Sequence, residues 1–164
     1  MNSKRQSLKP ENNQNSEITS RQKIKNINIK KINLILKEVF FLLNEPRAKV
    51  SILFCDNKFI SKLNKKFFKN MRPTDVIAFP LQDKLQKDYL GEIVISVEQA
   101  EKACPYYGKK WQEELMLYLI HGILHLLGYD DTKAKEKLIM DRKQERILQR
   151  LVEADSNLIY SIDR

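Results

Sequence analysis

Two histidines, His121 and His125, stand four residues apart in a strongly apolar segment of the chain. In a helix, side chains at this separation lie one above the other on the same face, so both imidazole rings could reach one metal ion. Histidine pairs with this helical spacing are known from zinc sites. The alternative is a pair of buried, hydrogen-bonded histidines without a metal. We predict the metal site, because a turn rich in carboxylates follows the pair.

That turn is expected to supply a third ligand. Gly128 ends the apolar segment, and Asp130 and Asp131 follow it, which gives the spacing His-x3-His-x2-Gly-x2-Asp. Asp131 is the preferred ligand and Asp130 the alternative, while capping of the next helix is the alternative role for Asp131. Three protein ligands leave the fourth position of a tetrahedral zinc ion to water, as a catalytic site requires. We predict one Zn2+ per chain, bound by His121, His125 and Asp131, with the zinc-bound water as nucleophile and no assigned acid or base.

Gly122 stands between the two histidines, where zinc proteases of the His-Glu-x-x-His type carry their general base. Without that carboxylate, peptide hydrolysis lacks its water-activating group, so a metalloprotease is the least favoured function. A glycine inside a helix also costs about 1 kcal/mol relative to alanine. We expect the close approach of a strand or a ligand to compensate for this cost.

The metal-binding pair must be positioned by the helix that carries it, predicted from Gln112 to Leu127. This segment is apolar almost all round, which is typical of a core helix. A single polar stripe interrupts its surface (Glu114, Tyr118, His121 and His125). The stripe therefore defines the face on which the predicted site lies.

The spacing of apolar residues predicts the other elements. Strands are expected at residues 24–29, 48–55, 74–79 and 92–96, and further helices at 31–43, 56–68, 97–103 and 132–152. Strands come early and helices late, which favours an α+β fold. We expect a single domain in which a small mixed sheet of about four strands is packed by about five helices.

The two ends of the chain are expected to lie outside this domain. Residues 1–20 contain few apolar side chains and are predicted to be a disordered basic leader, followed by a folded domain at 21–155 and a tail at 156–164. The net charge is +9, but residues 1–31 alone contain eight Lys and Arg against two Glu. The net charge by itself therefore does not decide between a polyanionic partner and a solvated basic tail.

Two cysteines, Cys55 and Cys104, have no paired spacing and no secretory context. No apolar stretch is long enough for a signal peptide or a membrane span. We expect a cytoplasmic protein with no membrane association and no disulfide-linked partner.

The segment His121–Asp131, HGILHLLGYDD, resembles the metal motif of the YbeY family of zinc-dependent, single-strand-specific endoribonucleases. Leu63–Asn64, Pro73–Pro80 and Gly91–Ser96 look like further family segments, so the resemblance covers about residues 24–152. It implies an endoribonuclease that acts on single-stranded and ribosomal RNA. Its tasks would be rRNA processing, including maturation of the small-subunit 3′ end, and ribosome quality control, with the ribosome as partner. The alternative is a non-catalytic ribosome- or RNA-binding assembly factor with a structural zinc.

Two positions depart from the family pattern. The third ligand is usually histidine, and Asp131 stands there; its negative charge would make the ion a weaker Lewis acid. The family also typically has an arginine where this chain has Phe68, so the phosphate-holding role of that arginine cannot be transferred. Lys69 and Arg72 are neighbours that could replace it.

Six basic residues and no acidic ones lie between Asn57 and Thr74 (Lys58, Lys62, Lys65, Lys66, Lys69 and Arg72). The five lysines fall at helical spacing and would form a cationic stripe leading toward the metal, to which the phosphates of RNA are the natural complement. The alternative is a solvated helix face. We predict that Lys62, Lys66, Lys69 and Arg72 contribute to RNA binding.

Overall fold

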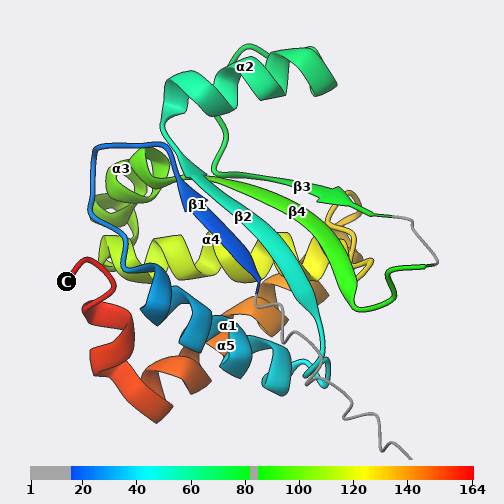
Figure 1. The fold of residues 1–164 in the computed structure, drawn as a ribbon. Helices are drawn as coiled ribbons and strands as arrows, with labels where there is room; N and C mark the ends of the chain where they lie inside the picture. Colours follow the sequence, from blue (N-terminus) through cyan, green and yellow to red (C-terminus); the bar gives the residue numbers. More distant parts are fainter. Residues whose placement is uncertain (1–15, 82–84) are drawn as a thin grey trace, which may run out of the picture.

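The computed structural model describes residues 16–81 and 85–164, which form one four-stranded sheet and five helices (Figure 1). The strands are β1 (Glu17–Ser20), β2 (Lys49–Cys55), β3 (Val76–Pro80) and β4 (Tyr89–Ser96). The helices are α1 (Ile29–Leu42), α2 (Asn57–Phe68), α3 (Val97–Tyr107), α4 (Trp111–Leu126) and α5 (Ala134–Tyr160). The expected α+β domain with a small mixed sheet is thereby confirmed.

The sheet has the strand order β1-β2-β4-β3. β1 and β4 both pair in parallel with β2, whereas β3 pairs with β4 in the antiparallel direction. β4 is an inner strand, and its run Ile93–Ser96 is buried on both faces of the sheet. This burial explains why Ile93, Val94 and Ile95 are all apolar rather than alternating with polar residues.

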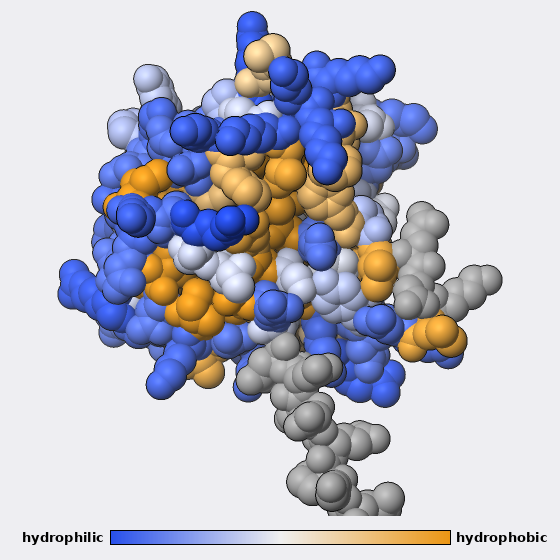
Figure 2. All heavy atoms as spheres, turned by 45° about the horizontal axis from the view of Figure 1, so that its top comes forward, coloured by the Kyte–Doolittle hydropathy of each residue, from blue (hydrophilic) through white to orange (hydrophobic). Residues whose placement is uncertain are grey.

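The two faces of the sheet are covered unequally. α4 packs directly against β3 and β4, and α5 packs against both α4 and α1, while α2 lies on the opposite face of the sheet (Figure 1). The large core lies between the sheet and α4, where Leu115, Leu119, Ile120 and Ile123 are fully buried. A smaller cluster under α2 joins Ile60 to the other face of the sheet. Figure 2 shows this side, where apolar surface is visible between strongly hydrophilic side chains.

Gly122 allows α4 to lie close to the sheet. A Cβ atom added there would be 2.7 Å from Cγ2 of Ile93 in β4 and 3.2 Å from Cγ2 of Val76 in β3. Both methyl groups are attached directly to Cβ of a β-branched residue and have little freedom to move aside. The close approach of strands thus accounts for a helix-interior glycine.

The first strand differs from the prediction. It is β1 at Glu17–Ser20, and residues 21–28 form a loop in which the Gln22 side chain accepts hydrogen bonds from the backbone N–H groups of Ile24 and Lys25. β1 is mostly exposed and exists through its parallel pairing with β2, which local apolar spacing does not reveal. It lies inside the segment predicted to be disordered, of which residues 1–15 are outside the described residues.

The C-terminal residues also differ from the prediction, because they pack on the domain. α5 is broken at Asp155, which has non-helical φ and ψ angles of −155° and 84°, and the Asp155 carboxylate accepts a hydrogen bond from the N–H of Leu158. Beyond this break, Ile159 and Ile162 are buried in the core. The N–H of Asn28 donates to the Ile162 carbonyl at 2.6 Å, so the end of the chain is fastened beside the start of α1.

α3 is longer than predicted, since it continues through Pro105 and ends at Gly108, where φ is 63°. Pro105 has no N–H to donate to the carbonyl of Glu101. The thiol of Cys104 donates to that carbonyl instead, at 3.2 Å. A local side-chain contact thus makes the proline tolerable inside the helix.

Both cysteines are free thiols. Burial raises the pKa of the Cys55 thiol to about 12, so this group is unreactive at neutral pH. Among the described residues, no helix combines the length and the apolar character that crossing a bilayer would require.

Candidate metal centre

A tight turn at the end of α4 brings the following residues back toward the helix. The N–H of Gly128 donates to the carbonyl of His125, and the N–H of Tyr129 donates to the carbonyl of Leu124, both at 3.0 Å. These two bonds form a Schellman motif, with Gly128 in the left-handed region at φ 91°. The motif reverses the chain so that Asp131 returns to the face that carries both histidines.

Three ligand atoms converge beside this turn. Nε2 of His121 and Nε2 of His125 are 3.0 Å apart, and Oδ2 of Asp131 lies 3.4 and 3.5 Å from them, respectively. Bonds of about 2.1 Å in a tetrahedral zinc site place neighbouring ligand atoms about 3.4 Å from one another. The triangle therefore has the size of one face of a zinc coordination tetrahedron, and the three side chains could hold one metal ion.

Hydrogen bonds on the outer side of each ring orient the histidines. Nδ1 of His121 is 2.9 Å from Oε1 of Gln144, and Nδ1 of His125 is 3.1 Å from the carbonyl of Tyr129. Both partners are acceptors, so each Nδ1 carries the ring proton and each Nε2 turns a lone pair inward. Two lone pairs and a carboxylate that face one another repel, and a cation between them removes the repulsion. The donor set thus fits zinc.

The two neighbouring aspartates have different surroundings. Asp130 is exposed, and its carboxylate accepts hydrogen bonds from the N–H and the hydroxyl of Thr132, which lower its pKa. Asp131 instead faces both imidazoles. Together with His121 and His125, it makes up the single group of three His, Cys, Asp or Glu side chains in residues 16–81 and 85–164 that could hold a metal ion.

The predicted RNA-binding residues lie elsewhere. Lys62, Lys66, Lys69 and Arg72 are exposed on α2 or just after it. α2 lies on the sheet face opposite α4, so Lys62 and Lys66 are separated from the three ligand atoms by the sheet (Figure 1), whereas Arg72 directly precedes Pro73, which lines the pocket beside His121. RNA binding by these four residues stays a prediction.

A pocket of about 680 Å³ opens beside His121 and is bounded by the segment that follows α2. Its wall contains several carboxylates (Asp75, Glu114, Asp141 and Glu145) and two lysines (Lys109 and Lys137). Gln144 also lines it. Sequence reasoning missed Asp75 and Gln144, because neither belongs to the helix or the turn that carries the three ligand atoms. No spacing rule connects Gln144 of α5 with His121 of α4.

The Glu114 carboxyl faces this pocket from α4 and is only 4% exposed. Burial is the main reason why its pKa is raised above the ordinary value of 4.5. The folded state therefore holds a proton more tightly than the unfolded state, and stability decreases as the pH rises from the unfolded pKa through the folded pKa. We expect Glu114→Gln to raise the melting temperature at pH 7, with a difference from the wild type that shrinks toward pH 4.

Thermal unfolding between pH 4 and pH 8 in EDTA measures this effect without a contribution from metal release. Glu38→Gln, which changes an exposed glutamate of α1, is the matched control and should leave the melting temperature almost unchanged. A lower melting temperature of Glu114→Gln at pH 7 would show that the buried charge is compensated in the folded state.

The chain is similar to known proteins of one family. The model of a family described as Endoribonuclease YbeY matches residues 10–152. Endoribonuclease YbeY of Carboxydothermus hydrogenoformans is 38% identical over 138 residues, which cover 83% of this chain and 96% of the relative. Endoribonuclease YbeY of Petrotoga mobilis is 41% identical over 122 residues, which cover 73% and 82%. The solution structure of TM1509 from Thermotoga maritima matches with a TM-score of 0.63 and 27% identity, covering 88% of this chain and 94% of that one.

Proposed function

The chain belongs to the Endoribonuclease YbeY family, and from this premise and its metal centre we propose that it is a zinc-dependent endoribonuclease specific for single-stranded RNA. Within this proposal it acts in ribosomal RNA processing, including maturation of the small-subunit 3′ end, and in ribosome quality control. Its partners are then ribosomal RNA and the ribosome, and its place is the cytoplasm.

One observation carries the proposal: three ligand atoms of His121, His125 and Asp131 lie 3.0 to 3.5 Å from one another while both outer ring nitrogens are hydrogen-bonded. In this arrangement the two inward-facing nitrogen lone pairs and the carboxylate repel one another, and a cation bound between them would remove that repulsion. We assign these three side chains as the zinc ligands, with one ion per chain.

A zinc ion held by these three side chains would act as a Lewis acid toward the phosphodiester and would lower the pKa of its bound water toward neutrality. The chain's own groups hold this chemistry in place. Gln144 and the Tyr129 carbonyl fix the orientation of the two rings, and ring positioning of this kind strengthens metal binding about 10- to 100-fold. Gly122 leaves no carboxylate between the histidines, which separates the site from that of zinc proteases.

A non-catalytic assembly factor with a structural zinc is the second candidate. Phe68, which is 58% exposed, occupies the position where the family resemblance expects an arginine that holds phosphate. Asp131 in place of a third histidine also adds negative charge beside the reacting phosphate. Both features favour a protein that binds RNA without cutting it.

Cleavage of an end-labelled single-stranded RNA distinguishes the two candidates. We expect products with zinc-loaded protein, none after chelation or with His125→Ala, and a return of cleavage when zinc is added back to the chelated sample. Full zinc occupancy without cleavage would favour the assembly factor. Equal cleavage in all samples would reveal a contaminating nuclease and remove the support for the proposal.

A further inference from the structure

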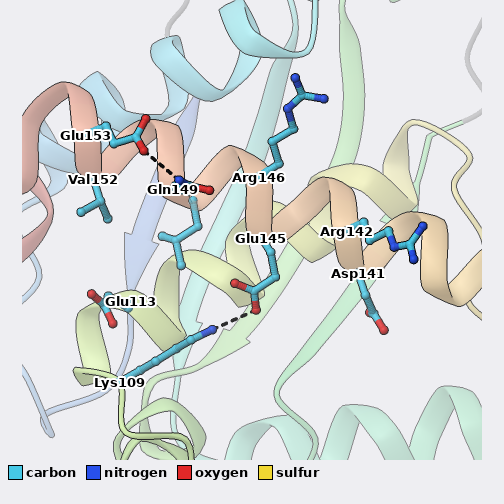
Figure 3. A pocket seen from close by; sticks show the side chains of 10 residues that line it. Lys109, Glu113, Asp141, Arg142, Glu145, Arg146, Gln149, Val152 and Glu153 are labelled. Carbon is cyan, nitrogen blue, oxygen red and sulfur yellow. Dashed lines mark hydrogen bonds and ion pairs between the residues drawn. The ribbon is translucent and has the colours of Figure 1, made fainter.

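The charged side chains in the middle of α5 are spread unevenly around the helix. Asp141 and Glu145 point toward the start of α4, where Glu145 forms an ion pair with Lys109 at 2.9 Å (Figure 3). This side borders a pocket of about 750 Å³ between the two helices. Arg146 projects from the other side of α5, away from Lys109 (Figure 3). Arg142 and Arg146 also line this pocket, so they lie between its acidic side and the other side of α5.

The other side forms a second hollow, of about 370 Å³, between α5 and the end of α1. Leu42 and Ile147 contribute its apolar part, and every other lining residue is basic (Arg142, Lys143, Arg146 and Arg150). We call these four residues the α5 basic stripe. The three arginines recur every four residues, so they share one helix face at intervals of about 6 Å along the axis.

The arginines of the α5 basic stripe have no counter-charge in the part of the chain that the structure describes. All three are exposed, and neither an ion pair nor a hydrogen bond engages their guanidinium groups. Elsewhere on α5 the opposite holds, because Lys137 pairs with Asp141 at 2.7 Å. Like charges four residues apart repel one another in an isolated helix. An external anion would remove this repulsion.

The α5 basic stripe also reaches the metal centre. Nζ of Lys143 lies 5.3 Å from the centroid of the Tyr129 ring, and the Tyr129 carbonyl accepts the hydrogen bond from His125. The next residue of α5, Gln144, is the partner of His121. α5 therefore orients a ligand with one side and presents a continuous row of cations with the other.

We propose that the α5 basic stripe binds the phosphate backbone of the substrate RNA, at nucleotides beyond those at the metal centre. The inference rests on the proposed function. It extends the surface that contacts RNA from the turn after α4, which carries Asp131, along α5. Arginine forks pair with phosphate oxygens in a bidentate manner, and such contacts give affinity without reading the sequence. The stripe is distinct from the lysines of α2, which lie across the sheet.

The test compares two triple variants of the full-length, zinc-loaded chain. The arginine variant combines Arg142→Gln, Arg146→Gln and Arg150→Gln. The matched lysine variant combines Lys23→Gln, Lys30→Gln and Lys102→Gln. Both variants lose three positive charges, and the control positions lie on the loop before α1, on α1 and on α3. The probe is a fluorescent 2′-O-methyl RNA of about 20 nucleotides, longer than most single-strand binding sites. Anisotropy titrations over a range of salt concentrations give the Kd, and a gel confirms that the RNA stays intact.

Each lost phosphate contact lowers the slope of log K against log salt by about 0.7 for a single strand. The arginine variant should therefore lose about 2 from the slope and bind about 10- to 100-fold more weakly at 0.1 M salt. The lysine variant should stay within about twofold of the wild type, since its three positions lie outside the α5 basic stripe and salt screens surface charges over about 10 Å. Zinc content and helicity, measured on each variant, should be unchanged, because glutamine and arginine have similar helix propensity.

Equal weakening by both triple variants would overturn the proposal, because net charge alone would then explain binding. The proposal would also be overturned if the arginine variant kept the wild-type slope of log K against log salt for RNA. The same holds if that variant bound RNA like the wild type and lost only its binding to vesicles of anionic lipid. In all these cases RNA cleavage by the wild type would leave the proposed function intact. A wild type that neither binds nor cleaves RNA would refute both. If the triple variant unfolds, Arg146→Gln with Arg150→Gln should still lower the slope by about 1.4.

Discussion

Replacing His125 with alanine is expected to remove the bound zinc and, with it, RNA cleavage. Its Nε2 is one of three ligand atoms, and only His121 and Asp131 would remain to hold the ion. Zinc content after dialysis should fall from one per chain to almost none, and cleavage should fall at least about 100-fold, because the metal supplies the activated water. The stabilisation by zinc, about 4 kcal/mol at a concentration of 1,000 Kd, should disappear as well.

Elemental analysis, cleavage and thermal unfolding with and without zinc measure these three losses on one preparation. His121→Ala should behave in the same way. Gln144→Ala keeps all three ligand atoms but releases the ring of His121, so its zinc affinity should fall only about 10- to 100-fold. A His125→Ala variant that still carries one zinc per chain would contradict the site.

The adjacent aspartates provide a matched pair for the third ligand. Asp131→Ala should weaken zinc binding, because its carboxylate faces both imidazoles. Asp130→Ala should keep the zinc and lose only the hydrogen bonds with Thr132. The reverse result would transfer the ligand role to Asp130.

Replacing Gly91 with alanine is expected to destabilise the fold more than any other glycine substitution. A Cβ atom there would lie 2.2 Å from the carbonyl oxygen of Phe79 and 2.9 Å from the backbone nitrogen of Leu81, at a φ of 140°. The strained backbone costs about 1–3 kcal/mol and the overpacking a further 1–3 kcal/mol. The sum of roughly 2–6 kcal/mol is a large part of the 5–15 kcal/mol that stabilises a typical domain. Urea unfolding measures it directly.

Gly108→Ala is the matched control, because Gly108 also has a positive φ, 63°, but nothing lies within 4 Å of an added Cβ. Gly108→Ala should lower the free energy of unfolding only by the cost of a left-handed backbone conformation for alanine, about 1–2 kcal/mol. If both variants were equally stable, the close pairing of β3 and β4 at Gly91 would not be the constraint that the structure indicates. Because the added Cβ would also lie 3.1 Å from Leu126, the zinc affinity of Gly91→Ala should decrease.

The sequence by itself determined the local part of this protein. The two histidines, the terminating Gly128 and the capping Asp56 act over separations of a few residues, where helix geometry specifies which side chains meet. The Asp56 carboxylate accepts the N–H of Phe59 at 2.8 Å and caps the start of α2. The same locality made the metal motif and its family recognisable from the residues alone.

Only the tertiary structure decided which distant groups meet. Gln144 reaches His121 across 23 positions, β1 exists through pairing with β2, and the C-terminal residues are held by the core rather than by their own periodicity. Helix packing also decided that Lys143 and Arg150 of α5 line the hollow beside α1, while Asp141 and Glu145 line the pocket beside α4 and Arg142 and Arg146 border both. The spacing of residues predicts which side chains share a face of a helix, but the packing of the helix in the fold determines what each face contacts.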